Sequence, residues 1–236
     1  MDIKNRHPLI LLEGMDNSGK SSLSNKLTAK FNQLGISSKL FSEPVKDNNL
    51  RNLILNHDEF NKFGIKYDLT KDYLRYYLFH ASRAKVLEDI CLNINSNMIF
   101  LDRSYISTMV YQYKLNPLVT IMLENEILYE RISRNILRNN FFCSPDLILF
   151  LDINAESYIS RFEGRKLYKN DNLDLSPSQI DKINFNIESY RFVINELKNS
   201  YKYNIKTIDA NQPEDEVLNQ ASEIILNFLS ICDSNH

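Results

Sequence analysis

The sequence predicts a single α/β domain over residues 1–236, in which a five-stranded parallel sheet is flanked by helices. Short apolar runs of strand length alternate with longer segments of helical periodicity. A Gly-x-x-x-x-Gly-Lys-Ser segment joins the first apolar run to the first helix. The chain length of 236 residues suits one domain, and 43% hydrophobic with 25% charged residues is typical of a globular protein.

The strands and helices follow from periodicity and from residues that start or stop helices. The predicted strands are 9–12, 38–41, 98–101, 147–151 and 204–208. The predicted helices cover 21–31, 50–56, 69–95, 118–139, a segment that starts near 176, and 213–231. Gly35 stops the first helix, Pro177 occupies a first-turn position, and three acidic residues open the last helix. Residues 164–175 are polar and basic, and we expect them to be irregular.

The segment from Gly14 to Ser21 matches the loop that wraps a nucleotide's phosphates. Glycine lets the backbone approach a ligand, and successive N–H groups then form a cradle for anions. The N-terminus of the following helix adds partial positive charge. Lys20 supplies a full charge for the β- and γ-phosphates, and the Ser21 hydroxyl is placed to bind Mg²⁺. The sequence therefore predicts a site for ATP or GTP, whose residues are Gly14, Asn17, Ser18, Gly19, Lys20, Ser21 and Ser22.

Charged residues fall at or just beyond the end of every predicted strand. They are Asp16, Glu43, Asp102, Arg103, Asp152 and Asp209. Ligands of open α/β sheets bind outside the carboxyl ends of the strands, so we expect these side chains to border a site. Asp102 can hold Mg²⁺ directly or through water, and Arg103 can form a two-pronged contact with a phosphate.

Bulk composition argues against several other classes of protein. The formal net charge is −2, so we predict no nucleic-acid or membrane partner. No apolar run reaches transmembrane length, and residues 1–8 lack the apolar core of a signal peptide. The three cysteines are far apart, which suits reduced thiols and a cytoplasmic location.

The combined motifs resemble the thymidylate kinase family. A switch GTPase would need Asn-Lys-x-Asp and Asp-x-x-Gly in suitable places, and the chain has neither. The family pattern matches here, in order, at Leu12–Ser21, Ser42–Pro44, Leu78–Arg83, Asp102–Gln112, Pro145–Asp152 and Ile208–Ala210. Each shorter match is weak, but six in sequence over nearly the whole chain make a specific pattern. The resemblance implies a nucleoside-monophosphate-kinase fold with a P-loop, usually as a homodimer.

The same resemblance implies roles for residues of an acceptor site that binds dTMP. Phe79 would stack on thymine, and Arg83 would hydrogen-bond the base. Arg103 would hold the acceptor phosphate, Tyr111 would lie against the sugar, and Ser107 would border base or sugar. The remaining acceptor-site predictions are Asp16 near the sugar hydroxyl or the metal, Glu43, and Arg51 as a second phosphate contact.

On the donor side, the resemblance implies ATP with Mg²⁺, and a mobile lid over about residues 161–175. Ser21 and Asp102 are the predicted metal ligands, and Asn211 would border the adenine. In this family a cation for the transition state comes either from the phosphate loop or from the lid. The loop carries neutral Asn17 here, so we expect Arg165, with Arg161, to supply that charge.

Departures from the family pattern leave the acceptor open. Ser42 stands where the family has arginine, Val45 where it has glycine, and Ser104 where it has tyrosine. Glu43-Pro44-Val45 and Arg103-Ser104 also resemble deoxynucleoside kinases, which phosphorylate a 5′-hydroxyl and would need Glu43 as a base. A catalytically silent P-loop module is a third alternative, against which the intact Lys20, Ser21, Asp102 and Arg103 argue.

Overall fold

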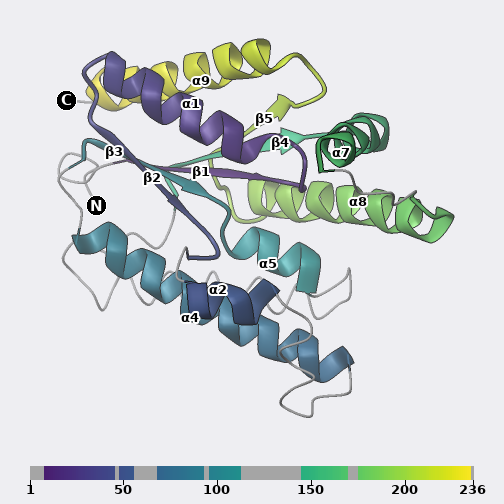
Figure 1. Cartoon of the computed structure of the whole chain (residues 1–236). Coiled ribbons are helices and arrows are strands. Elements are labelled where there is room, and N and C mark those ends of the chain that lie inside the picture. The colour runs from purple at the N-terminus through teal and green to yellow at the C-terminus, as the bar shows by residue number, and fades with distance from the viewer. Residues whose placement is uncertain are drawn as a thin grey trace.

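The computed structural model describes residues 8–45, 48–55, 68–92, 96–112, 145–169 and 175–234. Within these residues a five-stranded parallel sheet has the order β2-β3-β1-β4-β5, as predicted (Figure 1). The strands are β1 (Leu9–Gly14), β2 (Ser38–Ser42), β3 (Met98–Asp102), β4 (Leu147–Asp152) and β5 (Ile205–Asp209). Every residue of β1 and β3 is buried, as expected for strands covered on both faces.

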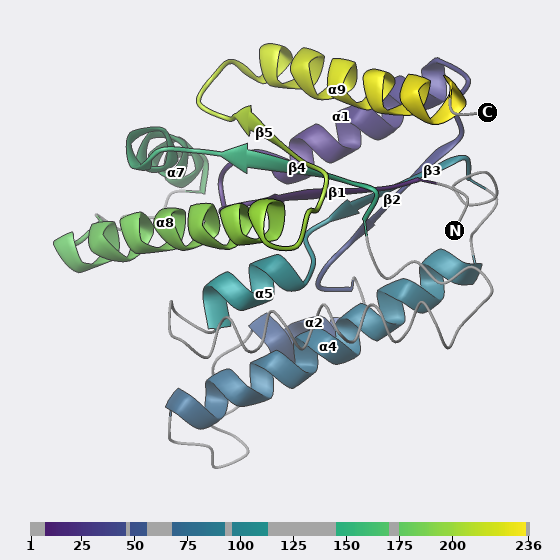
Figure 2. The same cartoon turned by 180° about the vertical axis from the view of Figure 1, so that it is seen from behind.

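Helices cover both faces of the sheet and make the fold a three-layer structure (Figures 1 and 2). One face carries α1 (Lys20–Gln33) and α9 (Glu214–Ser234). The other carries α2 (Asn48–Leu55), α4 (Asp68–Leu92), α5 (Tyr105–Gln112) and α8 (Pro177–Asn199). The helix α7 (Ala155–Lys169) lies beyond the carboxyl end of β4. The predicted helix 118–139 lies outside the described residues.

Two helical segments correct the sequence analysis. No helix is predicted from the sequence between 139 and 176, but the structure has α7 there, and the stretch expected to be irregular, 164–175, is helical as far as Lys169. A single glycine at position 164 costs a helix about 1 kcal/mol, and the arginine and lysine that follow favour helix, so the segment continues α7. The short helix α5 was not predicted, because its eight residues follow a strand directly and are mostly buried.

The register of the sheet brings the strand ends together at one edge. Leu12 in β1 pairs with Asp102 in β3, Ser42 in β2 pairs with the same residue, and Asp152 in β4 pairs with Asp209 in β5. The loops that follow β1, β2 and β3 therefore meet at this edge, where the predicted site residues lie. In the part of the chain that the structure describes, no helix is long and apolar enough to cross a membrane.

Candidate active site

The loop after β1 has the backbone that its glycines were predicted to allow. Gly14 has a φ of +146°, and a Cβ there would lie 2.5 Å from the carbonyl oxygen of Leu151 in β4. No side chain could be added without moving that backbone. Gly19, with a φ of +97°, precedes α1 as its N-cap and brings no side chain over the first N–H groups of the helix. The loop can therefore present backbone N–H groups to an anion.

Lys20 is buried beneath this loop. Its Nζ donates to the carbonyl oxygen of Met15 at 2.6 Å and contacts Ser18 Oγ at 3.3 Å. Burial, reinforced by the positive charge of Arg103 and opposed by three nearby carboxylates, lowers the pKa of Lys20 to about 7. The ammonium is folded back onto its own loop and held partly by neutral acceptors, so an anionic ligand would offer it a better partner.

Binding of ADP at pH 8.5 should therefore be accompanied by uptake of about 0.9 proton. With a pKa of about 7 most of the Lys20 amine is neutral at that pH, and contact with phosphate oxygens restores the charged form. Calorimetric titration in two buffers of different ionisation enthalpy measures the uptake. The control is Lys20→Arg, which stays charged and should take up no proton. An uptake of zero in the wild-type protein would contradict a depressed pKa.

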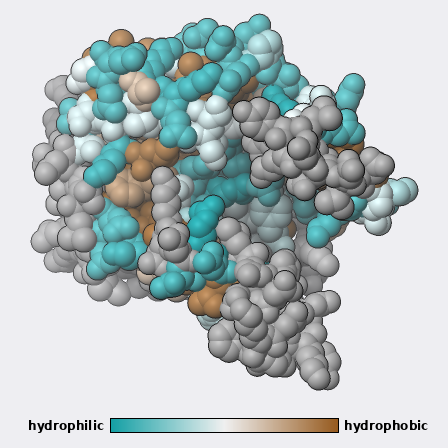
Figure 3. Space-filling view, in the orientation of Figure 1, coloured by the Kyte–Doolittle hydropathy of each residue, from teal (hydrophilic) through white to brown (hydrophobic). Residues whose placement is uncertain are grey.

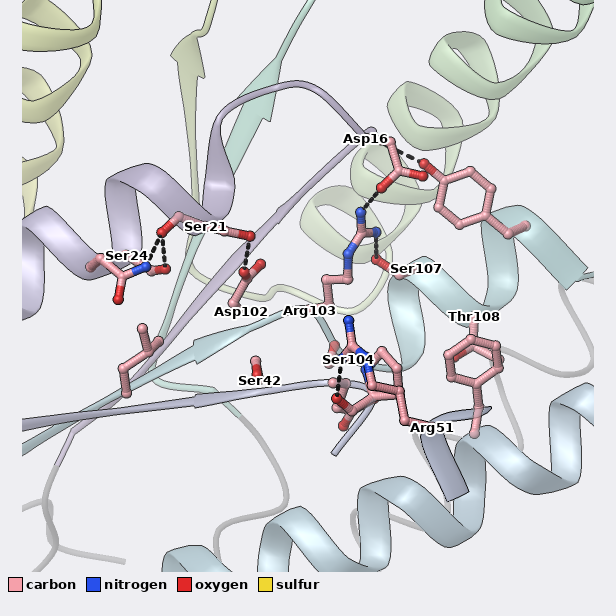
Figure 4. Close-up of a pocket in the computed structure, with 16 residues that line it drawn as sticks. Asp16, Ser21, Ser24, Ser42, Arg51, Asp102, Arg103, Ser104, Ser107 and Thr108 are labelled. Atoms are coloured by element: carbon pink, nitrogen blue, oxygen red, sulfur yellow. Dashed lines mark hydrogen bonds and ion pairs between the residues drawn. The ribbon is translucent and has the colours of Figure 1, made fainter. Parts of the chain in front are cut away.

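Ser21 and Asp102 form a pair at the end of β3 that suits a magnesium ion. Ser21 Oγ donates to Asp102 Oδ2 at 2.6 Å (Figure 4). Among the described residues, the other carboxylate oxygen, Asp102 Oδ1, is buried without a hydrogen-bond partner. A hydroxyl and a carboxylate with spare acceptor capacity, beside a phosphate-binding loop, are the oxygen ligands Mg²⁺ takes together with phosphates and water. The residues present therefore fit the metal that was predicted.

Arg103 follows Asp102 directly and turns toward the loop after β1. Its backbone has a φ of +74°, unusual for a residue other than glycine, and its N–H donates to the carbonyl oxygen of Leu12 at 3.1 Å. The guanidinium bonds Asp16 and donates to Ser107 Oγ at 3.1 Å (Figure 4). It also lies over the ring of Tyr111. A residue that keeps an uncommon φ because the surrounding structure holds it, as the bond to Leu12 of β1 does here, is typical of functional sites.

A buried carboxylate that has no role in the sequence analysis holds the segment that follows Arg103. Glu13 is fully buried at the end of β1. It accepts hydrogen bonds from the backbone N–H of Ser104 at 2.7 Å, from the Ser104 hydroxyl at 3.2 Å, and from the Ser107 hydroxyl at 2.7 Å. Burial raises the pKa of Glu13, whereas the Ser107 hydrogen bond and the charge of Arg103 lower it. A carboxylate within the apolar run Leu9–Gly14 was the available signal.

These residues surround a cavity of about 480 Å³ on the β3 side of the loop (Figure 4). Most of the predicted acceptor-site residues line it: Asp16, Glu43, Arg51, Phe79, Arg103, Ser107 and Tyr111, together with Ser21 and Asp102. Arg51 donates to the carbonyl oxygen of Pro44 at 3.4 Å, and the Tyr111 hydroxyl accepts from the N–H of Asp16 at 3.0 Å. On the face seen in Figure 3, apolar residues form small groups among hydrophilic ones around a central hollow.

Arg83 is the predicted acceptor residue that does not line this cavity. Its Nε lies 3.2 Å from Glu43 Oε1, its Nη2 donates to Thr108 Oγ1 at 3.1 Å, and its guanidinium lies over the ring of Tyr105. Glu43 is buried, which raises its pKa, and the charge of Arg83 opposes that rise. Arg83 therefore anchors Glu43, and Glu43 and Thr108 are the members of this cluster that reach the cavity.

Two of the three departures from the family pattern also line the cavity. Ser42 and Ser104 are both lining residues, and the Ser104 hydroxyl is directed to Glu13. Val45, the third departure, is instead buried in the core, and its N–H donates to Ser82 Oγ at 2.7 Å. The chain therefore differs from the family pattern at the cavity surface through small hydroxyl side chains.

A second cavity, of about 740 Å³, lies on the other side of the loop between α7 and the start of α9. Arg161 crosses between these elements. Its Nη1 donates to the carbonyl oxygens of Asn17 and Ser18 at 3.2 and 3.1 Å, and its Nη2 donates to that of Ala210 at 2.5 Å. The lining also includes Gln212, Pro213 and Glu214. The two cavities thus share the phosphate-binding loop as a common wall.

The remaining donor-side predictions have separate outcomes. Asn211 does not line the second cavity; its side-chain oxygen accepts from the N–H of Asn154, and its amide donates to Asp209. Ser22 bonds the carboxylate of Glu214, which also pairs with Lys26 at 2.9 Å. The backbone of Arg165 belongs to α7, one turn beyond Arg161, but its side chain lies outside the described residues.

Comparison with known proteins agrees with this geometry. The sequence model of the family described as thymidylate kinase matches residues 12–221. A thymidylate kinase of Mycoplasma capricolum subsp. capricolum is 31% identical, over 93% of this chain and 95% of that protein. A probable thymidylate kinase 1 of Saccharolobus solfataricus is 27% identical (92% and 96%), and a thymidylate kinase of Leptospira interrogans is 28% identical (95% and 97%). The chain belongs to the thymidylate kinase family.

Proposed function

We propose that this protein is a dTMP kinase, which transfers the γ-phosphoryl group of ATP to dTMP and releases dTDP and ADP. The observation that carries the proposal is the placement of Arg103 in a cavity that shares the phosphate-binding loop with a second cavity. A monophosphate held by Arg103 would face the donor phosphates held by Lys20. Membership of the thymidylate kinase family supports dTMP as the acceptor.

The proposed reaction needs positioning more than it needs a base. An oxygen of the acceptor phosphate attacks the γ-phosphorus, and the bond from that phosphorus to the β–γ bridging oxygen breaks, so that ADP leaves. The attacking oxygen is already ionised, and no proton has to be removed. Lys20 and the loop N–H groups would hold the donor phosphates, and Arg103 would align the acceptor. Ser21 and Asp102 would hold Mg²⁺, which supplies charge neutralisation when bound.

The base and sugar of dTMP would occupy the part of the cavity bordered by Phe79, Thr108 and Tyr111. Phe79 offers a ring face for stacking, and Tyr111 is held against the loop by the N–H of Asp16. The predicted contact of Arg83 with the base would have to be replaced by one through Glu43 or Thr108, which Arg83 anchors. The homodimer and the cytoplasmic location stay predictions from the family resemblance and the composition.

An acceptor panel tests the proposal. ADP release with ATP and Mg²⁺ would be measured with dTMP, dUMP, dGMP, dAMP, dCMP and thymidine, one at a time. We expect turnover with dTMP and none with thymidine; activity with other monophosphates would show how far Ser42 and Ser104 broaden the acceptor range.

The deoxynucleoside kinase alternative has one observation in its favour, because Glu43 lines the cavity and burial raises the pKa of its carboxyl group. Turnover with thymidine alone would establish it and overturn the proposal.

Arg165→Ala should lower kcat about a thousandfold and change KM for dTMP less than twofold. An arginine that contacts the transferring phosphoryl group acts mainly in the transition state, where charge spreads onto the equatorial oxygens. Asn17 in the loop carries no charge, and Arg161 is already engaged with loop carbonyl oxygens, so the proposal assigns this charge to Arg165. Steady-state kinetics provide the measurement, with Lys166→Ala as the matched control. Near-normal turnover of the Arg165 variant would refute the assignment.

A further inference from the structure

Tyr190 lies in α8, outside all of the family motifs, yet its side chain contacts two residues that line the acceptor cavity, Ser107 and Tyr111. Its side chain is almost completely buried. Its hydroxyl lies 2.9 Å from Ser107 Oγ, its ring meets that of Tyr111 edge-on at 5.8 Å between centroids, and it stacks on Phe150 of β4. A buried tyrosine hydroxyl that is hydrogen-bonded to a cavity-lining serine calls for a physical account.

The hydrogen bonds around Ser107 fix which group donates. A serine hydroxyl has one proton to give and two lone pairs to offer. Glu13, which accepts three hydrogen bonds as a carboxylate, takes the Ser107 proton at 2.7 Å. Arg103 donates to one lone pair at 3.1 Å, so Tyr190 must donate to the other. Burial raises the pKa of Tyr190 well above its ordinary value, which keeps the phenol protonated and able to donate.

We propose that Tyr190 is a positioning residue for the acceptor phosphate: its hydroxyl orients Ser107, and Ser107 in turn orients the guanidinium of Arg103. The inference rests on the proposed function, in which Arg103 holds the phosphate of dTMP. Without the Tyr190 donor, the Ser107 hydroxyl keeps its hydrogen bond to Glu13 but loses one of the contacts that fix its rotamer, so its contact with the Arg103 guanidinium is no longer held in place. Tyr111 keeps its ring contact with residue 190 in a phenylalanine variant, although it loses the hydrogen bond that it shares with the Tyr190 hydroxyl.

Tyr190→Phe should raise KM for dTMP about tenfold, while KM for ATP changes less than twofold. A purely structural role would alter both constants together or alter thermal stability alone. The matched control is Ser189→Ala, which removes a buried hydroxyl from the adjacent residue of α8. That hydroxyl bonds the carbonyl oxygen of Phe185 at 2.7 Å, so its loss should leave both constants unchanged. An unchanged KM for dTMP in Tyr190→Phe, or an equal rise in both constants, would overturn the proposal.

A double-mutant cycle with Ser107→Ala tests the route of the effect. Because Tyr190 acts through Ser107, adding Tyr190→Phe to Ser107→Ala should raise KM for dTMP less than a further twofold. A full tenfold effect in that background would show that Tyr190 does not act through Ser107 and would overturn the proposal. Wild-type turnover of dTMP tests the proposed function separately. Crystal structures without substrate provide an independent test. We expect the contact between Arg103 and Ser107 in the wild-type structure and expect its loss in the Tyr190→Phe structure. Persistence of this contact in both structures would contradict the positioning role of Tyr190.

Discussion

Arg103→Met should reduce kcat/KM for dTMP about a thousandfold. The planar guanidinium can make two parallel hydrogen bonds to a phosphate, each worth about 1.5–3 kcal/mol when the groups are charged. Losing both corresponds to about 4 kcal/mol, or three factors of ten in rate. Methionine keeps much of the length and apolar contact of the side chain, so the change removes mainly charge and hydrogen bonds. Steady-state kinetics at saturating ATP measure the effect.

Two further variants separate recognition by Arg103 from general damage to the site. Arg103→Lys keeps the charge but loses the two-pronged geometry, and we expect it to fall between wild type and Arg103→Met. Arg191→Met removes an arginine whose ion pair with Asp152 is partly exposed on α8, and it should stay within about twofold of wild type. ADP affinity should change little in Arg103→Met, because the donor cavity does not include this residue. A loss of ADP binding equal to the loss of dTMP turnover would show a general collapse of the loop.

The sheet and the phosphate loop could be predicted because their signals are local. The strands β1, β3 and β4 are largely apolar runs, and Gly14 and Gly19 adopt the positive φ values that their motif requires. The short helix α5 could not be found in this way, since its eight residues make only about two turns and most of them are buried. The helix α7 (Ala155–Lys169) is absent from the predicted elements, because its second half is polar and basic like a loop, although arginine and lysine favour helix.

The candidate site was predictable where a residue acts through its position next to a motif. Asp102 and Arg103 end a strand beside the P-loop, and the register of β1 with β3 makes their proximity almost unavoidable. The family resemblance implies that Arg83 hydrogen-bonds the base, and the sequence alone does not reveal that Glu43 and Thr108 contact its guanidinium. Tyr190 carried no local signal, because a tyrosine on the inner face of a helix is ordinary core packing until the fold places it beside Ser107.

Glu13→Gln should lower the free energy of unfolding by about 3 kcal/mol. Glu13 is fully buried and accepts three hydrogen bonds, and it offsets the positive charge of Arg103. The amide has one acceptor oxygen where the carboxylate has two, so its NH₂ group must face either the Ser104 donors or the Ser107 hydroxyl. Breaking a buried charged network by changing one member typically costs 3–5 kcal/mol, and the retained amide oxygen recovers part of this. Equilibrium unfolding in urea at pH 7.5 provides the measurement.

The matched control is Glu223→Gln, which removes the same charge from an exposed position on α9 and should change the free energy of unfolding by less than about 0.5 kcal/mol.

The same experiment tests whether Glu13 is ionised in the native protein, because burial raises its pKa while its hydrogen bonds lower it. If Glu13→Gln were as stable as wild type, the carboxyl group would have to be protonated in the native protein, and Ser107 could then no longer be required to donate to it. A large loss in Glu13→Gln, together with a raised KM for dTMP, would instead support an ionised Glu13 that fixes the loop carrying Arg103. The stability of the fold and the alignment of the acceptor phosphate would then depend on the same buried carboxylate.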